Sequence, residues 1–210
     1  MEGIMAKTNA VQRFILTIIV FIGIQGAAHG IAEILQGNKP TGGSVLETMG
    51  AFTLIHNYLY TGIAATAVSI AIIAWGFLKI GSRFFTAGFF LLCVALFFTG
   101  GGAAFVLFMI FVLIASLFRN GAGGMVKKMA SGKAGAFLAP LAGRLLIITY
   151  GCITAGVAVW LIFIPPGELH ELTAYHIACW SLLLAGLAGH IPSLFAAIAA
   201  DAGAERFAGK

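Results

Sequence analysis

Long apolar stretches separated by short polar connections dominate the chain, and this pattern predicts membrane-spanning helices. A helix needs about 17–25 apolar residues to cross the roughly 30 Å of hydrocarbon in a bilayer. Apolar stretches of about this length cover residues 13–35, 51–78, 83–100, 102–118, 143–164 and 172–199. We therefore expect an all-α integral membrane bundle of about six transmembrane helices, forming a single domain over residues 1–210.

Two parts of this pattern allow a second interpretation. The third and fourth stretches are short and joined only by Gly100 to Gly102, so they form either a very tight helical hairpin or a re-entrant pair. The first stretch follows Lys7 and Arg13 as a signal peptide would. Its apolar character continues to Leu35, however, and we expect a retained span.

Composition agrees with a membrane bundle and excludes several other classes. The chain is 60% hydrophobic and 9% charged, whereas soluble domains carry about 25% charged residues. The ten-residue alternation of membrane barrel strands is absent, and 28 glycines suit close helix packing. The cysteines Cys93, Cys152 and Cys179 lie in apolar runs without metal-binding spacing. The net charge of +5 comes from basic residues between apolar segments, so no nucleic acid is expected as a partner.

The distribution of basic residues predicts the orientation of the helices. If the N-terminus is cytoplasmic, only Lys39 falls outside. The basic residues placed inside are Lys7, Arg13, Lys79, Arg83, Arg119, Lys127, Lys128, Lys133, Arg144, Arg206 and Lys210. The outer loops instead carry Glu47, Glu168 and Glu171. Both termini are therefore expected in the cytoplasm, and the bilayer itself is the first partner.

Three histidines fall at one depth in this topology. His29, His56 and His176 lie on three different helices, each roughly 6–9 Å below the outer boundary. Ionisable residues inside spans are costly, so three at one level indicate a shared metal or cofactor site. The alternative is that each imidazole only hydrogen-bonds to a neighbouring carbonyl group. His170 lies just above them in the outer loop and is expected to be solvated.

The last stretch carries two histidines on one helix face. His176 and His190 are fourteen residues apart, which returns nearly to the same angle and separates the side chains by about 21 Å along the axis. One helix could thus offer axial ligands to two stacked haems. The glycines Gly62, Gly186 and Gly189 would leave room for a flat macrocycle, or would simply serve helix packing.

These features resemble the cytochrome b membrane subunits of bacterial respiratory complexes, such as those of formate dehydrogenases and nickel–iron hydrogenases. The resemblance rests on His176 and His190, on His56 in "FTLIHNYLYTG", and on the opening "VQRFILTIIVFIGIQG". It implies haem-ligating histidines at these positions in a multi-pass protein of a bacterial-type inner (plasma) membrane. It also implies electron transfer between the quinone pool and a partner redox subunit on the outer face, with any catalysis on a soluble substrate left to partner subunits.

The chain departs from this family at the inner haem. No histidine lies opposite His190 in the cytoplasmic halves of the other helices. We therefore expect one haem b, its iron ligated by His176 and His56 with His29 as the competing ligand. His190 is then a relic, a hydrogen-bonding residue, or the ligand of a second haem whose partner ligand is unusual or belongs to another subunit.

A quinone or proton site is expected on the first helix. His29 and Glu33 lie one turn apart on one face, and a histidine beside a carboxylate can accept the proton that an oxidised quinol releases. Gln25 and Tyr60 are further candidates for this site. The alternative places Glu33 at the headgroup level and Tyr60 in the interfacial aromatic belt.

Two other functions remain open at this point. A divalent-metal transporter or metal-binding membrane protein would use His29, His56 and His176 with Glu33, a nitrogen and oxygen set suited to zinc, nickel or copper. A structural anchor subunit would use the histidines only for hydrogen bonds. The presence of haem in the purified protein, visible as colour, would support the electron-transfer function over both alternatives.

Overall fold

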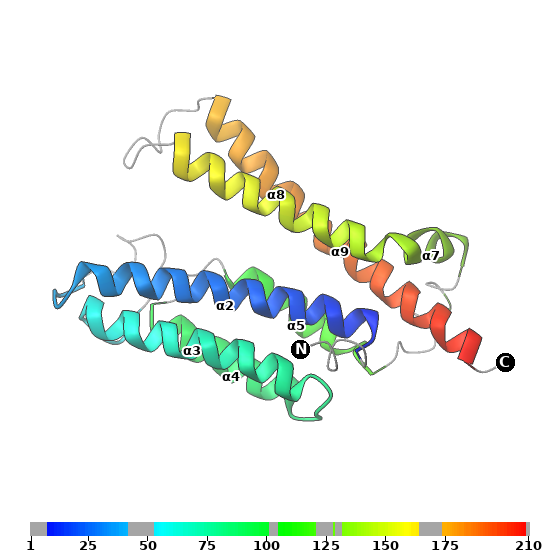
Figure 1. Ribbon diagram of the computed structural model, residues 1–210, viewed down its shortest axis with the longest axis horizontal. Coiled ribbons are helices and arrows are strands. Elements are labelled where there is room, and N and C mark those ends of the chain that lie inside the picture. Colours follow the sequence, from blue (N-terminus) through cyan, green and yellow to red (C-terminus); the bar gives the residue numbers. More distant parts are fainter. Residues whose placement is uncertain are drawn as a thin grey trace. The chain divides into compact units, whose positions relative to one another are not determined.

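The computed structural model describes residues 8–41, 53–100, 105–120, 128, 132–163 and 174–208, with the backbone alone for 160–163 and 205–208. Within these residues every regular element is a helix, and one isolated antiparallel bridge joins Thr53 and Thr99 (Figure 1). The all-α prediction is therefore confirmed. The helices divide into two compact units, Met1–Asn120 and Gly121–Lys210, each described here by itself. The expected single domain stays a prediction.

The described residues of unit 1 form a bundle of four antiparallel helices. They are α2 (Ala10–Gln36), α3 (Tyr58–Lys79), α4 (Phe85–Phe98) and α5 (Phe105–Ser116). Helix α2 packs against both α3 and α5, and α4 closes the ring by contacting α3 and α5 (Figure 1). Large side chains that are 0% exposed fill the centre; they include Ile15, Ile18, Ile19, Ile22, Ile72, Phe85, Phe89 and Leu96.

Asparagine caps fix where the first two helices begin. The Asn9 side chain accepts a hydrogen bond from the Gln12 backbone N–H at 2.7 Å, and the Gln12 side-chain oxygen accepts one from the Asn9 backbone N–H. Asn57 accepts from the backbone N–H groups of Leu59 and Tyr60. Such caps satisfy backbone donors that have no partner in the first turn of a helix.

Helices α2 and α3 approach closely because glycine lies at their contact. A methyl group on Gly62 would collide with the Gly30 carbonyl oxygen, and one on Gly30 would come within 2.5 Å of Thr66 Oγ1. Gly26 likewise faces the hydroxyl of Ser69. Small residues at a membrane helix interface allow this approach, and van der Waals packing then holds the pair.

The described residues of unit 2 form a long helical hairpin preceded by two short helices. The unit contains α7 (Lys133–Leu138), the 3₁₀ helix η1 (Ala139–Leu141), α8 (Ala142–Phe163) and α9 (Ala174–Ala208). Helix α8 packs along α9, and α7 and η1 pack against α9 as well (Figure 1). Helix α9 is 35 residues long and is not interrupted at Pro192, which lies inside it.

Among the described residues four helices are long and apolar enough to cross a membrane, so this is a multi-pass membrane protein. They are Ala10–Gln36, Tyr58–Lys79, Lys133–Val159 and Ala174–Ala204. Helices α4 and α5 have only 14 and 12 residues, or about 21 and 18 Å at 1.5 Å per residue. The hairpin and the re-entrant pair therefore both stay open for these two helices, and the prediction of six crossings stays a prediction.

Candidate functional site

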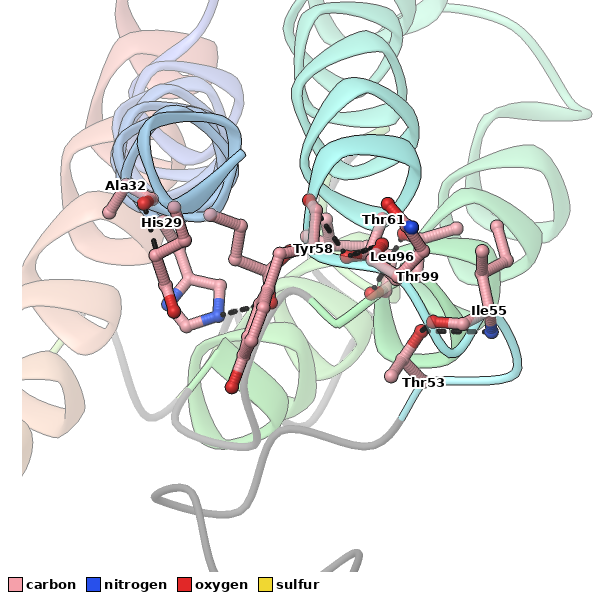
Figure 2. Close-up of polar contacts among 11 residues, drawn as sticks. His29, Ala32, Thr53, Ile55, Tyr58, Thr61, Leu96 and Thr99 are labelled. Atoms are coloured by element: carbon pink, nitrogen blue, oxygen red, sulfur yellow. Dashed lines mark hydrogen bonds and ion pairs between the residues drawn. The ribbon is translucent and has the colours of Figure 1, made fainter. Parts of the chain in front are cut away.

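A carboxylate and an imidazole meet at one end of unit 1. Glu33 is 5% exposed near the end of α2, and its Oε1 lies 3.4 Å from Nε2 of His29, one turn earlier on the same helix. The contact lacks hydrogen-bond geometry, because His29 Nε2 has no hydrogen-bond partner among the described residues, and it is an ion pair only when His29 is protonated. The second oxygen of Glu33, Oε2, has no hydrogen-bond partner among these residues either. In Figure 2 the dashed line from the His29 ring marks this pair.

The end of α4 supplies the space for this carboxylate. Gly100 has a φ of +84°, in the left-handed region that favours glycine. A methyl group on Gly100 would lie 3.1 Å from Glu33 Oε1 and 3.4 Å from Oε2. The antiparallel bridge between Thr53 and Thr99, with the Leu54 N–H donating to the Phe98 carbonyl at 3.1 Å, holds this end of α4. The sequence showed Gly100 only as one of three joining glycines.

The other two predicted residues of the quinone or proton site, Gln25 and Tyr60, are not buried beside Glu33. Gln25 and Tyr60 are exposed, Tyr60 by 56%. Glu33 is buried within unit 1, and its position at the headgroup level, the alternative interpretation, stays a prediction. The structure thus brings together His29 and Glu33, and gives Gln25 and Tyr60 exposed positions.

His56 lies outside the helix in which we expected it. The prediction placed it about five residues inside a span over 51–78, but α3 begins at Tyr58 after the Asn57 cap. His56 is therefore an exposed residue of the segment that precedes α3. The estimate that put His29, His56 and His176 at one depth relied on the wrong helix start for His56.

His190 is fully buried in unit 2 and both of its ring nitrogens are engaged. Nδ1 lies 3.0 Å from the Gly186 carbonyl oxygen and 3.2 Å from that of Leu187. Nε2 lies 3.3 Å from the Tyr150 hydroxyl on α8. Because a carbonyl can only accept, Nδ1 carries the proton and Nε2 accepts from Tyr150. A second hydrogen bond, between Thr149 and Ser193 hydroxyls at 3.2 Å, joins the helices nearby.

Room for a macrocycle and helix packing were the two interpretations of Gly62, Gly186 and Gly189, and neighbouring helices fill the space beside all three. A methyl group on Gly189 would lie 2.5 Å from Thr149 Oγ1, and one on Gly186 would lie 3.0 Å from the Thr149 carbonyl oxygen. The space beside Gly62 is filled by the backbone of Gly30, as described above. The first interpretation of these glycines was wrong, and helix packing is their role.

His176 is the remaining histidine of the predicted haem set. It lies in the first turn of α9 and is 6% exposed, so its imidazole is buried within unit 2. Trp180, one turn further along α9, is 57% exposed. His170 and the acidic residues Glu47, Glu168 and Glu171 lie outside the described residues.

These positions decide how well each predicted metal or cofactor site fits. A haem at the inner level would need His190 Nε2, which accepts from Tyr150, and the space at Gly186 and Gly189. The described residues do not fit that haem. For an outer haem, the buried imidazole of His176 is still available as a ligand. His29 is a poorer candidate, because its Nε2 faces Glu33. For the divalent-metal alternative, the described part of the chain contains no group of three His, Cys, Asp or Glu side chains placed to hold an ion.

A buried arginine ties together the other end of unit 1. Arg119 is 6% exposed and follows α5. Its guanidinium donates to the Ser82 carbonyl at 2.7 Å and to the Thr86 hydroxyl at 3.1 Å. Its own carbonyl accepts from the side chains of Asn9 and Gln12. Burial lowers the pKa of the Arg119 guanidinium, which still stays protonated. Sequence reasoning had treated Arg119 only as a charge at the membrane boundary.

Comparison of the chain with known protein families, with curated proteins and with solved structures found no match. The resemblance to cytochrome b subunits therefore remains a prediction that rests on the histidine positions and the two sequence segments quoted for it.

Proposed function

We propose that this protein is a membrane subunit of the cytochrome b type, which transfers electrons between the quinone pool and a partner redox protein on the outer face of a bacterial-type inner membrane. The observation that best supports the proposal is the buried imidazole of His176 at the start of α9. A buried histidine in a membrane helix is a functional candidate because its desolvation must be compensated.

One haem b would be held by His176, with His56 as its expected second ligand. Bound there, the haem would supply one-electron transfer. Of the two competing ligands, His56 is favoured over His29 because Nε2 of His29 lies against Glu33. His176 and His56 belong to different units, so their pairing is part of the proposal and not of the described geometry.

The charges of unit 1 support the proposed orientation. The contacts of Arg119 with Asn9 and Ser82 bring the start of α2 and the turn after α3 to one end. Arg13, Lys79 and Arg83 lie close in sequence to those points, whereas Lys39 follows the opposite end of α2. A cytoplasmic position for the basic end agrees with the positive-inside rule. Lys7, Lys127 and Lys210 lie outside the described residues, and only the backbone is described at Arg206.

Anaerobic mixing with a reduced short-chain quinol tests the electron-transfer role. The purified protein, oxidised beforehand, should gain the absorption of reduced haem within the mixing experiment. If dithionite reduces the haem and neither ubiquinol nor menaquinol analogues do, the quinone part of the proposal is wrong. If the oxidised protein also becomes reduced in a control without quinol, the electron source is not the quinol and the proposal loses its support.

A further inference from the structure

The pair formed by His29 and Glu33 has the properties of a site that binds and passes on a proton. Glu33 is almost completely buried, with one carboxylate oxygen 3.4 Å from His29 Nε2 and the other without a hydrogen-bond partner among the described residues. An isolated ionised carboxylate is very costly in such surroundings. A proton shared by the two groups makes the pair neutral overall, whichever of the two holds it.

The two side chains differ sharply in their access to the surroundings. The His29 side chain is 39% exposed and the Glu33 side chain only 7%. The i and i+4 spacing on α2 keeps them on the same helix face. His29 therefore lies between the exterior and the buried carboxylate, which is the position of a proton carrier.

The backbone conformation of Gly100 leaves space for the carboxylate of Glu33. Gly100 adopts a φ of +84° beside the carboxylate, and even a methyl group there would press against both oxygens. The bridge from Thr53 to Thr99 fixes this glycine relative to the segment before α3. A carboxylate that served only as a headgroup-level charge would need no such provision.

The neighbouring elements bring few other ionisable groups to this end. Lys39 follows α2, and His56 and Tyr58 lie at the start of α3. Among the described residues α4 carries only Cys93, in its middle, and α5 carries no titratable side chain. Glu33 is thus the single described carboxylate in this part of the bundle.

We propose that Glu33 and His29 form a proton-exchange site at this end of unit 1. A proton from the aqueous side binds the partly exposed imidazole of His29, the proton on its buried Nε2 passes to Oε1 of Glu33, and the imidazole becomes neutral again. One proton moves and no electron is transferred. The site does not depend on a bound haem, so it stands or falls separately from the proposed electron-transfer function.

Infrared difference spectroscopy of the purified full-length protein tests this site. On acidification we expect the C=O stretch of a protonated carboxylic acid that shifts in D₂O. The isosteric variant Glu33→Gln should lose this band, and Asp201→Asn, which alters a carboxylate of unit 2, should keep it. A band of equal size in Glu33→Gln and the wild-type protein would overturn the proposal.

The role of His29 has its own readout in the rate of deuterium exchange. His29→Gln should keep the Glu33 band but slow its exchange by on the order of 100-fold, the usual effect of losing one positioned proton-transfer group. Unchanged exchange would show that the proton reaches Glu33 without His29. Because His29 is partly exposed, this variant should fold even if Glu33→Gln does not, and circular dichroism of both variants checks their helix content.

Discussion

The Tyr150 hydroxyl of α8 lies 3.3 Å from Nε2 of His190 on α9, with the two rings in a T-shaped arrangement 5.5 Å apart. His190 is 0% exposed, and its other nitrogen donates to the Gly186 carbonyl. The imidazole is therefore a fully satisfied part of the contact between α8 and α9. The spacing of His190 from His176 suggested a second haem ligand. In the structure, His190 instead forms part of the contact between α8 and α9.

Removing the Tyr150 hydroxyl should weaken unit 2 by a small, measurable amount. Hydrogen bonds between membrane helices contribute about 0.6 kcal/mol on average and at most about 2 kcal/mol. We expect Tyr150→Phe to lower the free energy of unfolding within that range, measured by titration of the micellar protein with dodecyl sulfate. Tyr60→Phe, at a tyrosine that is 56% exposed, is the control and should change little. Equal stability of both variants would argue against the bond to His190.

The two histidines of α9 should differ in their effect on haem binding. His176→Ala removes the proposed outer ligand and should abolish haem binding, measured as haem per chain in the purified protein. His190→Ala removes a residue whose nitrogens are already engaged and should retain the haem. Equal loss of haem in both variants would contradict the assignment of one outer haem.

The glycine contact between α2 and α3 should be sensitive to a single methyl group. In Gly62→Ala the added carbon would collide with the Gly30 backbone, which cannot move away as a side chain could. We expect a loss of about 1–3 kcal/mol in the free energy of unfolding, typical of overpacking. Gly143→Ala on α8, with no atom within 4 Å of the added carbon, is the matched control. It should be neutral or stabilising by up to about 1 kcal/mol, and similar losses at both positions would contradict the close contact.

Arg119 should matter more for stability than a neighbouring exposed arginine. Arg119→Gln removes the guanidinium hydrogen bonds to Ser82 and Thr86, and should cost on the order of 1–3 kcal/mol. Arg83→Gln, at an exposed residue, should stay within about 0.5 kcal/mol of the wild type. Thermal unfolding in detergent, followed by circular dichroism, compares the two. A smaller loss of stability in Arg119→Gln than in Arg83→Gln would argue against a stabilising role for the Arg119 hydrogen bonds.

The apolar pattern was sufficient to predict the helical class and most helix positions, because run length and caps are local properties. The stretch expected over 143–164 corresponds to α8 at Ala142–Phe163. The start of α3 was wrong because the apolar residues before His56 extended the predicted span. Asn57 is the signal that was overlooked, since an asparagine before an apolar run is a preferred helix cap.

The surroundings of the candidate residues were less predictable, because they depend on how helices align. Nothing in the sequence around Tyr150 indicates that it meets His190, forty residues away. Gly100 could be recognised as part of a joining segment, but its place beside Glu33 depends on the packing of α2 and α4. His29 and Glu33 were paired correctly because both lie on one helix, where spacing alone sets the distance.

An absorption spectrum of the detergent-purified protein, recorded oxidised and then after reduction with dithionite, tests the proposed function most directly. We expect a Soret band that shifts on reduction and a sharp α band of the b type, with one haem per chain. A colourless protein that contains stoichiometric zinc, nickel or copper would contradict the electron-transfer function and favour a divalent-metal site. A colourless protein without metal would contradict it as well and leave the histidines with hydrogen-bonding roles alone.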